Sequence, residues 1–185
     1  MNMKKETIKL VAILFSFCAI GALILASLNS VTAPRIKALE KEKTDKALVE
    51  VFPDGGDFQE IELDGSNESI VEAYTVMSGG SEVGKCVLVD SQGFGGAIRM
   101  MVGVTNEGAV TGVSIVSMNE TPGLGTKAND AEWLSQFALK TSPISVVKGQ
   151  ATAENEIVAV SGATVTSKAV TAGVETAIAF AGGAN

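Results

Sequence analysis

An uninterrupted apolar stretch at residues 10–28 is the feature that most restricts how this chain can fold. The stretch holds no charged residue, and it has about the 20 residues that a helix needs to cross the hydrocarbon core of a membrane. A cleaved signal peptide fits less well, because the stretch exceeds the usual ~7–15 apolar residues and the best small-residue cleavage site, at Ala33, is followed at once by Pro34. We therefore expect a short N-terminal segment, residues 1–9, and a single retained transmembrane helix over residues 10–28.

The next segment is expected to connect the membrane to a folded domain. Pro34 suits the start of a helix, and residues 36–51 are rich in charge but keep apolar positions for one face. We expect a connecting helix over residues 29–52, ended by the Pro-, Asp- and Gly-rich segment 53–57, and one domain over residues 53–185. Lysines flank the apolar stretch on both sides, so charge alone does not orient it.

The domain reads as a β-meander interrupted by helices. Residues 71–77 and 85–89 flank one glycine-containing turn, and residues 97–104 and 109–117 flank another, which predicts two consecutive hairpins. A short helix is expected over residues 131–137 with Asn129 or Asp130 as its cap, then a strand at 144–147 and a helix at 169–181. This order predicts an α+β fold, with an antiparallel sheet and flanking helices, because parallel β-α-β units are absent.

The amino-acid composition excludes several kinds of catalytic and metal-binding site. The chain has no histidine, which excludes Ser-His-Asp catalysis, histidine-ligated haem and histidine-bound zinc. Cys18 lies in the apolar stretch and Cys86 is alone in the domain, so no disulfide within the domain and no cysteine-ligated cluster is expected. We expect no catalytic residue and no metal ligand.

The charge argues against nucleic acid as a partner. Residues 1–9 hold three lysines and one glutamate, net +2, which leaves −9 for the remainder of a chain whose total is −7. A domain this acidic repels a phosphate backbone.

The strongest site candidate is the run of small and hydroxyl-bearing residues at 161–168, just before the last predicted helix. The first N–H groups of a helix have no partner within it, and the helix dipole favours an anion there. Gly162 and Ala163, directly after Ser161, let the backbone come close to such an anion. The hydroxyls of Thr164, Thr166 and Ser167 could cap the helix, which general preferences favour, or one could carry a phosphate as an ester. Lys168 could neutralise the phosphate or be simply solvated.

A second candidate is the segment Glu120-Thr121-Pro122-Gly123-Leu124-Gly125. Proline fixes φ before a glycine that can adopt φ > 0, so a tight turn is predicted whose amides face a bound ring or phosphate. Alternatively, the segment only connects a strand to a helix. Glu120, Thr121, Gly123 and Leu124 are the candidate contacts, with Thr126 beside them.

These motifs together resemble the FMN-binding domain family. Residues 161–164 match the family's Ser/Thr-Gly-Ala-Thr flavinylation signature, and residues 120–125 and 93–98 resemble two further segments of it. In that family the last threonine of the signature is esterified to FMN, so the resemblance names Thr164 as the carrier of covalent FMN. The carriers include the G subunit of Rnf-type electron-transport complexes, which the length of this chain suits better, and the C subunit of the sodium-translocating NADH:quinone oxidoreductase.

The resemblance implies an electron-carrier subunit of a membrane-bound, ion-translocating ferredoxin:NAD oxidoreductase, a redox subunit rather than a complete enzyme. It also implies other complex subunits and a flavin-attaching enzyme as partners, and a domain outside the cytoplasmic membrane. One position departs from the family pattern, because Val158 stands where an aspartate is usual, with Glu156 as a displaced carboxylate. Two alternatives follow: a membrane-anchored assembly or scaffold subunit without flavin, or a stand-alone extracytoplasmic flavin reductase.

Overall fold

The computed structural model describes residues 3–53, 55–65 and 67–182, and it divides the chain into an N-terminal unit, residues 1–42, and a compact domain, residues 43–185. Asp54, within the break predicted at 53–57, lies outside the described residues.

Helix α1 (Met3–Val51) covers both the predicted transmembrane segment and the predicted connecting helix. None of its apolar window is buried in the protein, and it is the one described helix that is long and apolar enough to cross a membrane. The prediction that a new helix begins near Pro34 is wrong, because Pro34 lies inside α1. Proline has no N–H to donate to the Ser30 carbonyl, four residues before it, so α1 continues through Pro34 with one fewer helical hydrogen bond.

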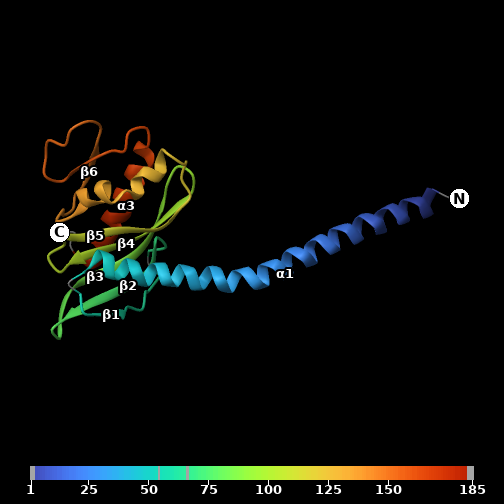
Figure 1. Ribbon diagram of the computed structural model, residues 1–185, viewed down its shortest axis with the longest axis horizontal. Helices are drawn as coiled ribbons and strands as arrows, with labels where there is room; N and C mark the ends of the chain where they lie inside the picture. Colours follow the sequence, from blue (N-terminus) through green and yellow to red (C-terminus); the bar gives the residue numbers. More distant parts are fainter. Residues whose placement is uncertain (1–2, 54, 66, 183–185) are drawn as a thin grey trace. The chain divides into compact units, whose positions relative to one another are not determined.

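The core of the domain is a five-stranded antiparallel sheet in the order β1-β2-β3-β4-β5, as in Figure 1. Its strands are β1 (Asp57–Glu60), β2 (Ile70–Ser78), β3 (Ser81–Gln92), β4 (Ala97–Thr105) and β5 (Val110–Met118). The two predicted hairpins are confirmed as β2–β3 and β4–β5. Gly79 and Gly80 turn the first one with φ of 60° and 84°, values that a two-residue hairpin turn requires.

Both faces of the sheet are buried, against different helices. Along β3, Val87 and Val89 belong to one apolar cluster, whereas Leu88 between them belongs to the other, as the alternation of side chains along a strand requires. The first cluster includes residues of α3 (Thr164–Ala181). The second contains the last turns of α1, at Ala47, Leu48 and Val51.

The chain between β5 and α3 builds the rest of the domain. It forms the short helices η1 (Gly125–Asn129), α2 (Ala131–Leu134) and η2 (Ser135–Phe137), and then the strands β6 (Ser145–Val147) and β7 (Glu156–Val158). Of the two predicted caps, Asn129 and Asp130, the structure has Asp130, whose side chain accepts a hydrogen bond from the Glu132 N–H at 3.1 Å. The sequence did not predict that β6 and β7 pair in parallel, in a second small sheet.

Candidate functional site

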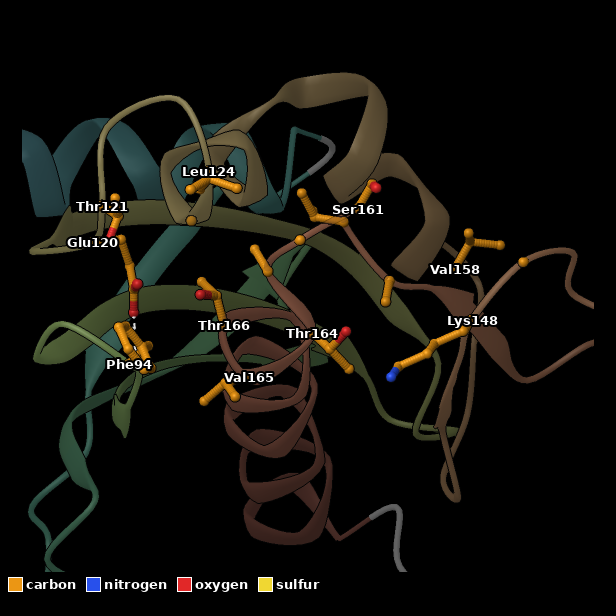
Figure 2. Close-up of a pocket in the computed structure, with 16 residues that line it drawn as sticks. Phe94, Glu120, Thr121, Leu124, Lys148, Val158, Ser161, Thr164, Val165 and Thr166 are labelled. Carbon is orange, nitrogen blue, oxygen red and sulfur yellow. Dashed lines mark hydrogen bonds between the residues drawn. The ribbon is translucent and has the colours of Figure 1, made fainter.

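A cavity of about 880 Å³ opens at the N-terminus of α3, as Figure 2 shows. Four parts of the chain line it: the loop and first turn at residues 158–166, the segment 120–125, the loop that holds Phe94, and residues 148–149. Its lining includes the predicted residues Ser161, Gly162, Ala163, Thr164, Thr166, Glu120, Thr121 and Leu124. Gly123, Ser167 and Lys168, which were also predicted, are not among the residues that line it.

Helix α3 begins at Thr164, five residues before the predicted 169–181, and its N-cap is Ala163. No side chain makes a capping hydrogen bond at this end in the part of the chain that the structure describes, so the predicted hydroxyl cap is wrong. The first-turn N–H groups of residues 164–166 therefore lack the usual side-chain acceptor. Gly162, with φ of 80°, gives the loop the left-handed turn that it needs before the helix.

The predicted site residue Ser167 is fully buried and bonded within the protein. Its hydroxyl donates to the Ala163 carbonyl at 3.0 Å and accepts from the Val160 N–H at 2.9 Å. This hydroxyl fastens the loop at 160–163 to the first turn of α3. Ser167 thus fixes the position of Thr164 from behind the cavity.

Replacing Ser167 with alanine is expected to loosen this loop. The buried Val160 N–H would lose its acceptor, at a cost of about 1–3 kcal/mol, which corresponds to a fall in Tm of roughly 3–8 °C. Thermal unfolding of the full-length chain measures this fall in Tm. Thr176→Ala is the control, because that exposed hydroxyl donates to the Ala172 carbonyl within its own helix and fastens no loop. Equal Tm values for the two variants would contradict the role given to Ser167.

A lysine enters the cavity from a segment that the sequence did not single out. Lys148 follows β6 and lines the cavity, and Figure 2 shows its amino group extended toward Thr164. Lys168 is exposed and lies outside the lining. Only the pairing of β6 with β7 brings Lys148 near the start of α3, so no local sequence signal could have found it.

The segment 120–125 forms the predicted tight turn. Gly123 has φ of 76° and donates its N–H to Thr126 Oγ1 at 2.9 Å. The turn packs closely on the start of α3, since a Cβ at Gly125 would lie 3.0 Å from Thr166 Oγ1 and one at Gly162 would lie 2.8 Å from Leu124 Cδ2. The two predicted segments are therefore one structural unit.

Glu120 is buried and binds a third predicted segment. Its Oε1 accepts hydrogen bonds from the N–H groups of Phe94 and Gly95, at 2.7 and 3.3 Å. A Cβ at Gly93 would lie 2.1 Å from the same oxygen, so glycine is needed there for the loop to approach the carboxylate. Through Glu120 the loop 93–96 becomes one wall of the cavity.

Val158 is held by two side chains from the short helices. Its carbonyl accepts from Trp133 Nε1 at 2.8 Å, and its N–H donates to Gln136 Oε1 at 2.9 Å. Its side chain helps to line the cavity. The nearby carboxylate of Glu156 accepts the N–H groups of Thr152 and Ala153, and these bonds lower its pKa. Glu156 thus stabilises the preceding loop.

The cavity has a polar end and an apolar end. Lys148, Ser161, Thr164 and the first N–H groups of α3 suit an anionic group. The other end has three exposed apolar residues: Phe94, Leu124 and Val165, exposed by 74%, 45% and 54%. An elongated ligand with a phosphate at one end and an aromatic ring at the other, such as FMN, fits this arrangement.

Comparison with known proteins also indicates an FMN-binding domain. Residues 93–179 match the model of the FMN-binding domain. The G subunit of the Na(+)-translocating ferredoxin:NAD(+) oxidoreductase complex of Acetobacterium woodii is 37% identical over 189 residues, which cover 94% of this chain and 91% of that protein. The G subunit of the proton-translocating complex of Clostridium ljungdahlii is 34% identical over 162 residues, 87% of this chain and 84% of that protein.

A solved structure supports the fold. The C subunit of a Na(+)-translocating NADH-quinone reductase from Parabacteroides distasonis aligns with a TM-score of 0.52 at 17% identity, covering 67% of this chain and 74% of that one. The chain has an FMN-binding domain joined to a candidate membrane helix. It belongs to the family of G subunits of ion-translocating oxidoreductase complexes.

Proposed function

We propose that this protein carries FMN as a phosphoester on Thr164 and passes electrons between neighbouring redox centres of a membrane-bound ferredoxin:NAD oxidoreductase that moves sodium ions or protons. The observation that carries the proposal is the position of Thr164, whose side chain lines the cavity at the uncapped N-terminus of α3. An ester at this hydroxyl holds the phosphate against the first N–H groups of the helix.

The residues around Thr164 have distinct roles in this proposal. Lys148 compensates the phosphate charge, and Gly162 lets the backbone approach it. Leu124 and Val165 exclude water beside the ring. The flavin supplies the redox chemistry, and the protein sets the polarity and hydrogen bonding around it, and thus its reduction potential.

Partners and location follow from the same proposal. Helix α1 anchors the protein in the cytoplasmic membrane as a single span, and the domain lies on the extracytoplasmic side. The other subunits of the complex supply and accept the electrons, and a flavin-attaching enzyme loads Thr164. A covalent bond prevents loss of the cofactor outside the cell membrane.

Fluorescence of the denatured protein tests the proposal. The full-length chain is co-expressed with a flavin-attaching enzyme, and the band is examined after a denaturing gel, where only covalent flavin remains. We expect a fluorescent band from the natural sequence. If only Val158→Asp gives one, the site is competent but this chain lacks a residue that the attaching enzyme needs. If neither fluoresces, the flavin proposal fails and the scaffold alternative takes its place.

Two lysine variants separate the proposed phosphate contacts. In a Thr164→Val background, where binding is reversible, Lys148→Gln is expected to weaken FMN binding about tenfold or more, because a charge-assisted bond to phosphate is lost. Riboflavin, which has no phosphate, should bind equally to both proteins. Lys168→Gln is the matched control, since that exposed lysine lies outside the cavity. Fluorescence titration measures both ligands, and a larger loss from Lys168→Gln would reverse the assignment.

A further inference from the structure

The loop 93–96 presents an aromatic side chain at the apolar end of the cavity, far along the chain from the flavinylation signature. Phe94 lines the cavity, yet 74% of its side chain is exposed. Phe94 shares this end of the cavity with the exposed Leu124 and Val165, and a group of exposed apolar side chains marks a ligand-binding surface where a single one would not. Its position beside the cavity suggests that a ligand packs on it.

The backbone around Phe94 is firmly held for an exposed loop. The buried Glu120 carboxylate accepts both the Phe94 and the Gly95 N–H groups, and the Gly93 N–H bonds to the Gly96 carbonyl at 2.9 Å. A Cβ at Gly95 would lie 2.2 Å from the Asn119 carbonyl oxygen, so the loop packs directly on the segment after β5, which carries Glu120. These contacts fix the direction in which the Phe94 ring leaves the loop.

Figure 2 shows the relation of this ring to the proposed attachment point. Lys148 approaches Thr164 from one side, whereas Phe94 lies on the other side, beyond Val165 and Thr166. A cofactor tied by its phosphate at Thr164 and extended away from Lys148 passes over Val165 toward Phe94. Aromatic rings attract one another in stacked and edge-to-face arrangements.

We propose that Phe94 packs against the isoalloxazine ring of the bound flavin and that Glu120 is the positioning residue that holds Phe94 there. This inference rests on the proposed function, because it assumes FMN on Thr164. It gives Glu120 a role different from direct contact with the cofactor: its carboxylate acts through the loop 93–96. The proposal also gives the direction in which the isoalloxazine ring extends, from the start of α3 toward the loop between β3 and β4.

Flavin fluorescence in the full-length, FMN-loaded chain tests the contact. Tryptophan in van der Waals contact with a flavin quenches its fluorescence strongly, so Phe94→Trp is expected to lower the fluorescence per bound flavin several-fold. Leu139→Trp is the matched control, because Leu139 is 82% exposed and does not line the cavity. Visible absorbance of the same samples gives the flavin content. Absence of flavin from both the natural chain and its Val158→Asp variant refutes the proposed function, whereas a loaded Phe94→Trp chain as bright as the control refutes this inference.

The role of Glu120 is tested in the Phe94→Trp background. Glu120→Ala removes the acceptor of both N–H groups, and the fluorescence should recover while the flavin content stays the same. Glu120→Gln keeps an acceptor oxygen and should preserve the quenching. If Glu120→Ala does not fold, Glu120→Asp, whose carboxylate is one methylene shorter, should give intermediate fluorescence. Quenching that is equal in every folded Glu120 variant would overturn the positioning role.

Discussion

Thr164→Val is expected to abolish covalent flavin while the domain stays folded. Valine has nearly the shape of threonine but no hydroxyl, so it cannot form the ester. Thr164 is only half-buried and its side chain makes no capping bond, so we expect a change in stability within about 1 kcal/mol. In-gel flavin fluorescence and thermal unfolding of the full-length protein measure the two effects.

Ser161→Ala is the matched control for this variant. Ser161 also carries a hydroxyl, is exposed and lines the same cavity, but it lies in the loop before the helix rather than at its first residue. It should retain full covalent flavin. If Thr164→Val keeps covalent flavin and Ser161→Ala loses it, Ser161 carries the ester and our assignment to Thr164 is wrong.

The largest expected effect on stability comes from Phe137→Ala. Phe137 is completely buried, and its ring packs edge-on against Trp133 with a centroid distance of 5.5 Å. Removing a buried phenyl ring costs about 3–5 kcal/mol, which corresponds to a fall in Tm of roughly 10 °C for a domain of this size. Trp133, the only tryptophan in the chain, reports the transition by its fluorescence.

Phe94→Ala provides the comparison for Phe137→Ala. The same side chain is removed from a position that is 74% exposed, so its effect on the free energy of unfolding should stay within about 0.5 kcal/mol. Flavin-free protein is used for both variants, because a bound flavin would add its own stabilisation. Similar Tm losses would contradict the burial described for Phe137.

The main features of the fold could be predicted because their signals are local. The charge-free stretch at residues 10–28 indicates a membrane helix by its length, and the glycine turn at Gly79 and Gly80 indicates a hairpin by its backbone preference. The continuity of α1 through Pro34 and the early start of α3 were missed, because proline and hydroxyl residues usually mark helix ends. The parallel β6–β7 pair joins segments that carry no pairing signal in the sequence.

The difference between local signals and tertiary contacts also explains which site residues could be predicted. Thr164 and Leu124 could be chosen because each lies in a recognisable motif, and the structure brings both to one cavity. Lys148 and Phe94 reach that cavity only through tertiary structure, one through β6 and the other through the bonds of its loop to Glu120. Ser167 belongs to the right motif, but the direction of its side chain on α3 turns it into the protein interior.

Peptide mapping by mass spectrometry of the full-length chain, co-expressed with a flavin-attaching enzyme, tests the central claim most directly. The account predicts that the peptide containing residues 161–168 gains the mass of FMN less one water, and that fragmentation places the addition on Thr164. An unmodified peptide from both the natural chain and Val158→Asp would contradict the account, and so would an addition outside this segment.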